Sequence, residues 1–329
     1  MSRSRSSEYD EWFDWEPSHR TENPSRRTRR RSRPRRCSGA LRWAAVLGVC
    51  ALLLLGAGKL WDGAPPAAVS GGGGTQTPFQ PGTELLEQLQ SLAREEPAAE
   101  ALLACPEDYP EELLELAVRN PEALDFVVRY PQEKDAQPAG SVGAVERGIF
   151  PLLMQWDPRW GCAPYGDGLM ALNGCGPTAL AMVVCGLTGD GSVTPWTVAQ
   201  YADEAGYYVE GAGSKWELMS TGCQHFGLVA RELPLDRSVM VRVLEDGQPI
   251  VCSVGPGDFT TSGHFILITG VEDGKFHVND PNRRANSEKL WDYDTLARYM
   301  TKESVEGRPV GAQMWTRSRN LEQPVVESC

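Results

Sequence analysis

The residues with the clearest chemical potential surround Cys175, in the stretch 174–178 (GCGPT). An apolar helix is expected directly behind this stretch, because Pro177 suits the first turn of a helix and residues 179–185 are all apolar. The unpaired N–H groups and the dipole of a helix N-terminus favour a thiolate over a thiol. Cys175 is therefore a candidate nucleophile, and the alternative is a small buried residue in a glycine-flanked turn.

A nucleophilic cysteine needs a base, and the chain has four histidines. His19 lies in a basic N-terminal tail, and His225 falls in the last turn of a predicted helix. His264 and His277 lie in two apolar runs that are typical of neighbouring strands. Which of these two histidines can act as the base depends on how the strands pair.

The hairpin between the two runs predicts that pairing. A three-residue loop at 272–274, closed by a glycine and a bulge, pairs Val271 with Lys275. In this register Asp280 lies diagonally next to His264 on one face of the hairpin, within reach of its ring. A two-residue turn without a bulge would instead point Asp280 away from His264.

His277 falls on the other face of the predicted hairpin, so it is expected to be structural. The residues thus predict His264 as the base and Asp280 as the carboxylate that orients it, on condition that the hairpin is odd-length or bulged. Residues 255–263, rich in glycine and small side chains, precede His264 and would let a substrate backbone approach; a plain turn cluster is the alternative.

The elements that carry these residues indicate an α+β domain. Helices are expected at 177–187, 195–205 and 214–226, and strands at 248–254, 264–271 and 275–280. Helices followed by an antiparallel sheet are typical of the α+β class. The domain extends from about residue 143 to residue 317.

These residues together resemble the C39-like papain-fold cysteine peptidases. The resemblance covers roughly residues 148–300 and rests on four stretches: 155–160 (QWDPRW), 174–178 (GCGPT), 263–265 (GHF) and 279–281 (NDP). It implies a papain-like fold, with N-terminal helices packed on an antiparallel sheet. It also implies Cys175 as nucleophile, His264 as base and Asp280 as orienting residue.

The resemblance implies a fourth site residue, Gln155, as the side-chain donor to an oxyanion hole next to the Cys175 N–H. In the exporter peptidases of the family this glutamine stands a few residues before the cysteine, whereas here twenty residues separate the two. The alternative is that Gln155 caps a local turn next to Trp156.

Charge and hydropathy indicate an N-terminal membrane anchor. Residues 1–42 hold 12 of the 32 basic residues and 6 of the 44 acidic ones. Residues 43–58 carry no charge, and Trp43 and Trp61 flank them as interfacial aromatics do. The positive-inside rule then places the N-terminus in the cytoplasm and the rest outside the cell. A signal peptide cleaved near residues 68–70 is the alternative, and a nucleic-acid role for the arginines is disfavoured.

The expected organisation has six parts. They are a basic cytoplasmic tail (1–39), a transmembrane helix (40–61), a flexible linker (62–82), a helical spacer region (83–134), the C39-like peptidase domain (143–317) and a C-terminal tail (318–329).

In the helical spacer region a residue–proline pair recurs at Tyr109-Pro110, Asn120-Pro121 and Tyr130-Pro131, and glutamate follows the first two prolines. A prodomain, a peptide-binding module and a packing collar all remain open for it.

No cofactor or metal is expected; the chain has no CxxC or HxxxH pattern that would indicate a zinc site. It also lacks a GxxxxGK[ST] motif, which disfavours the peptidase of a complete exporter. Of the nine cysteines, seven fall outside the membrane; six could pair, but their spacing forms no recognisable disulfide framework. The expected function is a membrane-anchored, extracellular cysteine peptidase acting on a peptide or protein, with no nucleic-acid partner. An inactive surface binding module and a papain-like amidase or acyltransferase are the alternatives, and the oligomeric state stays open.

Overall fold

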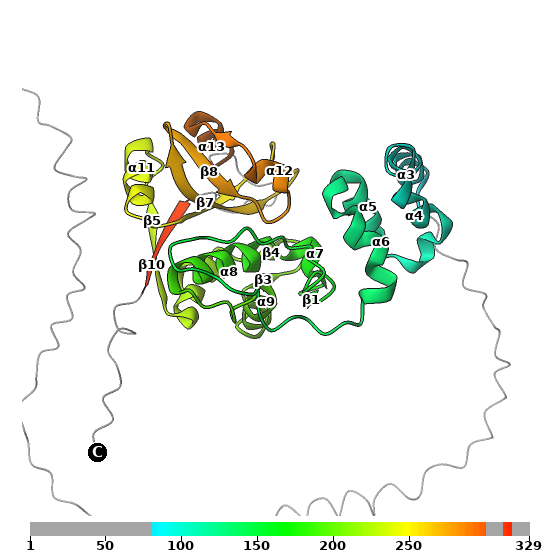
Figure 1. Ribbon diagram of the computed structural model, residues 1–329, viewed down its shortest axis with the longest axis horizontal. Helices are drawn as coiled ribbons and strands as arrows, with labels where there is room; N and C mark the ends of the chain where they lie inside the picture. Colours follow the sequence, from blue (N-terminus) through cyan, green and yellow to red (C-terminus); the bar gives the residue numbers. More distant parts are fainter. Residues whose placement is uncertain (1–80, 301–311, 318–329) are drawn as a thin grey trace, which may run out of the picture. The chain divides into compact units, whose positions relative to one another are not determined.

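The apolar runs of the C-terminal half form a six-stranded antiparallel sheet in the order β5-β10-β6-β7-β8-β9. The computed structural model describes residues 81–300 and 312–317, all within one compact unit of the chain (Figure 1). The strands are β5 (Leu228–Leu233), β6 (Ile250–Val254), β7 (His264–Glu272), β8 (Lys275–Asn279), β9 (Leu290–Trp291) and β10 (Ala312–Arg317).

The helices of this half form at the three predicted places and at four others that were not predicted. They are α7 (Met170–Asn173), α8 (Cys175–Thr188), α9 (Pro195–Glu204), α10 (Glu217–Ser220), α11 (Arg237–Glu245), α12 (Arg284–Ser287) and α13 (Tyr293–Met300), with the 3₁₀ helix η5 (Gly222–Phe226). Two short hairpins complete the unit: β1 (Pro164–Tyr165) with β2 (Gly168–Leu169), and β3 (Tyr208–Val209) with β4 (Gly213–Ser214). The helix expected at 214–226 is thus divided into α10 and η5.

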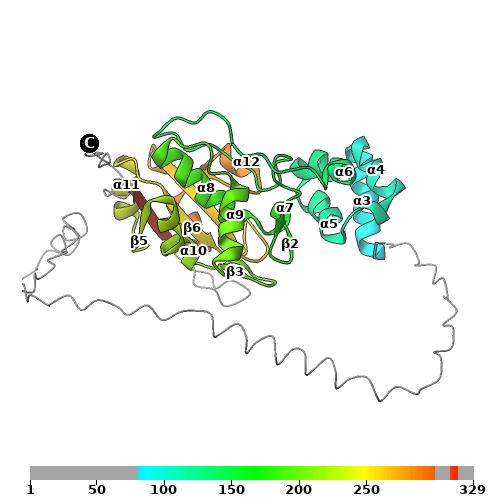
Figure 2. The ribbon, with the colours of Figure 1, turned by 90° about the horizontal axis from the view of Figure 1, so that it is seen from below.

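Helix α8 is the central element of the core. It is apolar on all sides, so it needs cover on all sides, and residues 176–186 are indeed all buried. It packs against β7 and lies beside α9 (Figures 1 and 2). Leu180, Phe265 and Leu267 belong to the same buried cluster. This packing fixes the start of α8 relative to the sheet.

The β7–β8 hairpin is bulged, as the pairing argument required, but the bulge lies elsewhere. The turn has two residues, Asp273 and Gly274, both with positive φ as in a type I′ turn. It pairs Lys275 with Glu272, so the expected partner Val271 was wrong. A register shift between Ile268 and Gly270 then corrects the alignment, and Leu267 faces Asn279 as expected.

Residues 83–134 form short helices separated by prolines, as the sequence predicts. They are α3 (Thr83–Glu95), η2 (Pro97–Ala99), α4 (Glu100–Ala104), η3 (Pro106–Asp108), α5 (Glu111–Arg119), η4 (Pro121–Ala123) and α6 (Leu124–Glu133). Their leucines share one buried cluster with Met154, Trp156, Cys162 and Ala171 of the following domain. The helical region is therefore packed against that domain.

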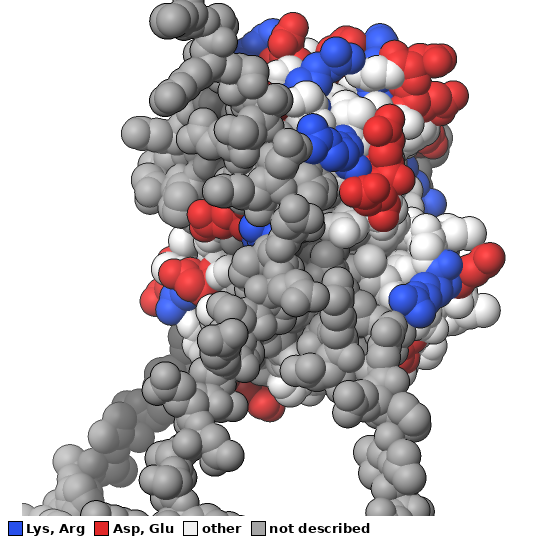
Figure 3. All heavy atoms as spheres, turned by 90° about the vertical axis from the view of Figure 1, so that its left-hand side faces the viewer, with Lys and Arg blue, Asp and Glu red and all other residues white. Residues whose placement is uncertain are grey.

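Basic and acidic side chains lie interspersed on the described surface that Figure 3 shows. Within residues 81–300 and 312–317, no helix is both long and apolar enough to cross a membrane. The expected cytoplasmic tail, transmembrane helix and C-terminal tail lie outside the described residues, as does most of the linker.

Candidate active site

Cys175 is the first residue of α8 and is partly exposed. The glycines on both sides of it are required by close packing, not only by the turn. A Cβ on Gly174 would collide with the Met170 carbonyl, and one on Gly176 would collide with the Ser214 side chain. The local sequence thus holds the thiol at the N-terminal end of a buried helix, as expected.

His264 and Asp280 form a buried pair. The His264 Nε2 lies 2.7 Å from the Asp280 Oδ1, and the exposed fractions of the two residues are 7% and 0%. Because Nε2 is occupied by the carboxylate, Nδ1 is the ring nitrogen left for another partner. The His264 ring also interacts with the Cys175 thiol. The structure therefore brings together the three residues that the sequence singled out.

The Asp280 carboxylate is held by a set of donors in addition to the histidine. Its Oδ1 accepts the Asn282 backbone N–H at 2.8 Å, and its Oδ2 accepts the Asn286 side-chain amide at 2.7 Å. The Asp280 N–H donates to the Ser287 hydroxyl at 2.9 Å. These bonds fix the carboxylate in one orientation and satisfy its buried oxygens.

Two opposed effects set the protonation of the pair. Burial lowers the pKa of His264, but the charge of Asp280 and the contact with Cys175 outweigh burial and raise it above the usual value. For Asp280, burial acts to raise the pKa, and the neighbouring histidine together with the Asn286 and Asn282 hydrogen bonds lowers it. Both shifts favour an imidazolium next to a carboxylate.

Gln155 lines a cavity with Cys175 and His264, but its amide nitrogen already contacts two backbone carbonyls. Its Nε2 donates to the Ala171 carbonyl at 2.7 Å and approaches the Leu172 carbonyl at 3.3 Å. Its backbone N–H donates to the Pro281 carbonyl at 2.8 Å, which ties it to the strand end that carries Asp280. The contact with the Leu172 carbonyl is the longer and weaker one. The N–H that makes it is the one that could turn toward a ligand.

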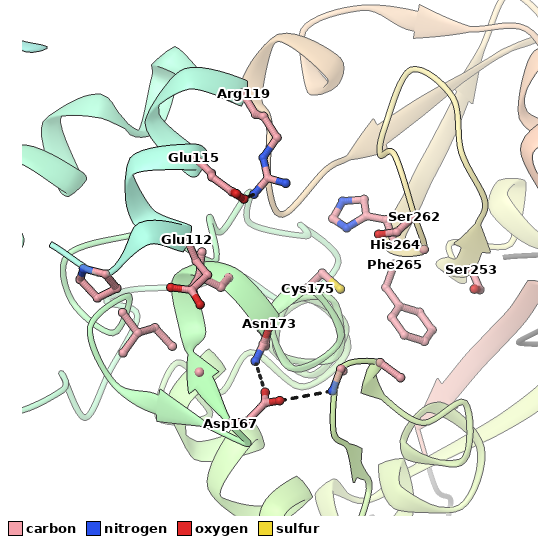
Figure 4. Close-up of a pocket in the computed structure, with 18 of the residues that line it drawn as sticks. Glu112, Glu115, Arg119, Asp167, Asn173, Cys175, Ser253, Ser262, His264 and Phe265 are labelled. Atoms are coloured by element: carbon pink, nitrogen blue, oxygen red, sulfur yellow. Dashed lines mark hydrogen bonds and ion pairs between the residues drawn. The ribbon is translucent and has the colours of Figure 1, made fainter. Parts of the chain in front are cut away.

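Two cavities meet at Cys175 and His264, which line both. The larger, of about 640 Å³, also takes Glu112, Glu115 and Arg119 from α5 (Figure 4). The smaller, of about 340 Å³, is lined by Gln155 and by the glycine- and threonine-rich loop 257–263. The two cavities give an extended ligand access to the thiol from two sides.

The other two histidines of the described residues, His225 and His277, pack or bond with residues outside the site. His225 stacks on Tyr201, with the ring centroids 4.0 Å apart, and the exposed His277 bonds Glu272 at 2.9 Å. His19 lies outside the described residues.

The cysteines also separate into distinct environments. Cys185 is buried, and burial raises the pKa of its thiol to about 11. None of the six cysteines of the described residues forms a disulfide.

Two residues of this site were missed from the sequence. Asn286 and Ser287 stand six and seven positions after Asp280, on the four-residue helix α12. The only local signal for them is the polar run 279–287 (NDPNRRANS), which reads as an ordinary loop.

The α+β fold thus places a cysteine at a helix start next to a buried histidine–carboxylate pair on the sheet, an arrangement that can activate a thiol nucleophile. Residues 149–308 match the Peptidase_C39 like family. The match spans just under half of the chain and includes Gln155, Cys175, His264 and Asp280. The chain therefore contains a C39-like domain, as the resemblance predicted.

The chain also matches solved structures. Among eleven chains that match is the crystal structure of a protein described as a C39-like peptidase from Bacillus anthracis. The match has 14% identity and a TM-score of 0.33, and covers 53% of this chain and 98% of the other. No curated protein matches the chain.

Proposed function

We propose that this protein is a cysteine peptidase that hydrolyses peptide bonds with Cys175, His264 and Asp280. One observation carries the proposal: the buried His264–Asp280 pair, with its 2.7 Å hydrogen bond, stands against the Cys175 thiol where two cavities meet. A histidine tied in this way is both oriented and charged. The family match supports a peptidase-like domain.

In the resting site the proton of Cys175 already lies on the Nδ1 of His264, so the two residues form a thiolate–imidazolium pair. The resulting thiolate attacks the carbonyl carbon of a peptide bond, and Asp280 stabilises the imidazolium. The tetrahedral intermediate collapses to a thioester, and His264 gives its proton to the departing amine. His264 then takes a proton from water, whose oxygen attacks the thioester and releases the acid and the thiolate.

The negative charge of the tetrahedral intermediate needs donors near the sulfur. The Cys175 N–H lies at the start of α8, where the helix dipole favours a negative charge. Gln155 is proposed as the second donor, on condition that its Nε2 turns away from Leu172. Loss of one such donor typically costs about 10²–10³ in turnover.

The place of action is proposed as the outer face of a membrane. The proposal rests on the uncharged run 43–58 and on the nine arginines within 23–42 that precede it. In this topology a membrane-anchored catalytic domain meets a peptide or protein substrate outside the cell.

Thiol reactivity tests the proposal directly. Full-length protein is treated with iodoacetamide at pH 7, and each modified cysteine is mapped by peptide mass spectrometry. Cys175 is expected to react at least about tenfold faster than the exposed Cys105, because a neighbouring imidazolium holds it as thiolate. Cys105 serves as an internal reference in the same chain.

The result also separates the alternatives. Equal rates at Cys175 and Cys105 would favour an inactive binding module. A reactive Cys175 whose products incorporate an added amine, rather than water, would identify an acyltransferase instead of a peptidase.

A further inference from the structure

The helical region contacts the segment that carries Asp280. This segment, residues 280–287, leaves the end of β8, contains α12, and supplies every donor to the Asp280 carboxylate other than His264 that the structure shows among the described residues. Three hydrogen-bonded links join it to residues 119–122, more than 150 positions earlier in the chain. Residues 119–122 lie outside the span of the family match.

Glu122 accepts two hydrogen bonds from this segment. Its Oε2 accepts the Arg284 N–H at 2.7 Å and its Oε1 accepts the Ala285 N–H at 3.1 Å. These are the first two residues of α12, whose N–H groups have no partner within the helix. Glu122 therefore caps α12 with a carboxylate from a distant element.

Helix α12 passes this support on to the site. Of its four residues, Asn286 donates to Asp280 Oδ2 and Ser287 accepts the Asp280 N–H. A shift of the cap at its N-terminus would move both partners of Asp280 together. The chain of contacts thus runs from Glu122 through α12 to Asp280 and His264.

Asn120 supports the other oxygen of the carboxylate. It is 1% exposed, and its Nδ2 donates to the Asn282 carbonyl at 2.6 Å. The N–H of the same Asn282 donates to Asp280 Oδ1. The Trp156 ring N–H also donates to this carbonyl, at 2.7 Å, so two side chains hold Asn282 in place.

We propose that Glu122 and Asn120 are positioning residues for Asp280, and that the helical region is a working part of the active site. This inference rests on the proposed function. It gives a role to the sequence Asn120-Pro121-Glu122 of the helical region. The role of that region stayed open from the sequence. The cavity around Cys175 agrees, because α5 lines it with Glu112, Glu115 and Arg119.

The test compares Glu122→Gln and Asn120→Asp with the wild-type full chain. In Glu122→Gln the new amide would set an N–H against the N–H of Arg284 or Ala285. In Asn120→Asp the new carboxylate would set an oxygen against the Asn282 carbonyl. The readout is the pH at which the mapped alkylation rate of Cys175 rises. In both variants the rise is expected to move to higher pH, toward the value of an ordinary thiol (about 8.5).

The rate at pH 7 is expected to fall about tenfold or more for Glu122→Gln, and less for Asn120→Asp because Trp156 remains. Glu111→Gln is the matched control, since Glu111 also follows a proline of the repeat and is exposed in the first turn of α5. It is expected to leave the profile unchanged. Glu122→Asp, which keeps both acceptors on a shorter side chain, is expected to recover part of the rate.

Alkylation of the buried Cys252 reports the fold in the same experiment. If Cys252 reacts quickly in Glu122→Gln or in Asn120→Asp, that variant has unfolded, and the inference is then tested on the other one. If Cys175 is reactive in the wild type and both variants show the same pH profile of its alkylation as the wild type, this inference is overturned and the proposed function is not. A wild-type Cys175 no faster than Cys105 would overturn the proposed function as well.

Discussion

At the scale of single residues, the site is a series of contacts in which each member orients the next. Asn286 and the Asn282 N–H hold Asp280, Asp280 holds the His264 ring, and the ring faces Cys175. Burial by itself would discharge the histidine, so the carboxylate is what keeps it charged. Substitutions along this series are therefore expected to change the protonation of His264.

The pH profile of peptide hydrolysis should show this dependence. In the proposed mechanism activity requires the imidazolium, and Asp280 raises the pKa of His264 above its ordinary value of 6.5. The alkaline limb of kcat/KM is therefore expected well above pH 6.5, with activity lost as pH rises through the raised pKa. In Asp280→Asn the raising charge is absent, so the limb moves to lower pH.

The same variant should lose turnover by up to about 10⁴-fold, the effect of this exchange in a Ser-His-Asp triad. His277→Ala, which removes an exposed histidine paired with Glu272, is the control and should keep the wild-type profile. An alkaline limb near pH 6.5 in the wild type, or an unshifted limb in Asp280→Asn, would contradict this assignment.

At the scale of elements, the sequence predicted correctly which residues of β7 and β8 share a face near the site. It did not predict the pairing next to the turn, where Lys275 faces Glu272. That His264 and Asp280 meet followed from periodicity and from the need for a bulge. The position of the bulge did not follow, because an Asp-Gly pair closes a two-residue turn and the register is corrected within β7, at Thr269, four residues before Asp273. Periodicity indicates a face, whereas turn geometry decides the exact partners.

Other elements depend on contacts that no local pattern shows. Strand β10 inserts between β5 and β6, from a position some sixty residues after β6. Glu122 caps a helix 162 positions away. Both arrangements arise from tertiary packing, so the sequence predicted the core helix α8 and the hairpin, but neither the full sheet nor the supports of Asp280.

The packing between α6 and the C39-like domain leads to a stability prediction. Phe126 of α6 is 2% exposed, and its ring lies so close to Gly161 that a Cβ there would meet it at 2.6 Å. Phe126→Ala is expected to lower the free energy of unfolding by about 3–5 kcal/mol. Urea unfolding is followed by circular dichroism and by alkylation of Cys252 in β6.

Both probes are expected to shift to lower urea by the same amount, because the helices and the sheet belong to one compact unit, which we expect to unfold cooperatively. Leu86→Ala, on an exposed side chain of α3, is the control. An unchanged Cys252 transition in Phe126→Ala would mean that the helical region unfolds independently.

At the scale of the whole molecule, charge distribution divides the chain. Residues 43–329 carry 20 basic and 38 acidic residues, whereas the first 42 residues are basic. On the described surface in Figure 3 the two signs are mixed. The basic excess thus belongs to the N-terminal tail next to the predicted anchor, which fits orientation at a membrane better than nucleic-acid binding.

Membrane attachment is expected to depend on residues 40–61. After expression in bacteria, the full chain should stay in the membrane pellet through an alkaline carbonate wash. A chain that begins at Asp62 should appear in the soluble fraction with the same alkylation rate at Cys175. Release of the full chain by the wash would contradict the predicted anchor.

The central claim is that Cys175 and His264 together hydrolyse peptide bonds. The most direct measurement is the cleavage of a proteome-derived peptide library, read by mass spectrometry, with wild type, Cys175→Ala, His264→Ala and Cys185→Ala. We predict new peptide termini with the wild type and with Cys185→Ala, whose thiol is buried, and none above background with the other two. Equal loss of cleavage in Cys185→Ala and Cys175→Ala, or cleavage that persists in Cys175→Ala, would contradict the account.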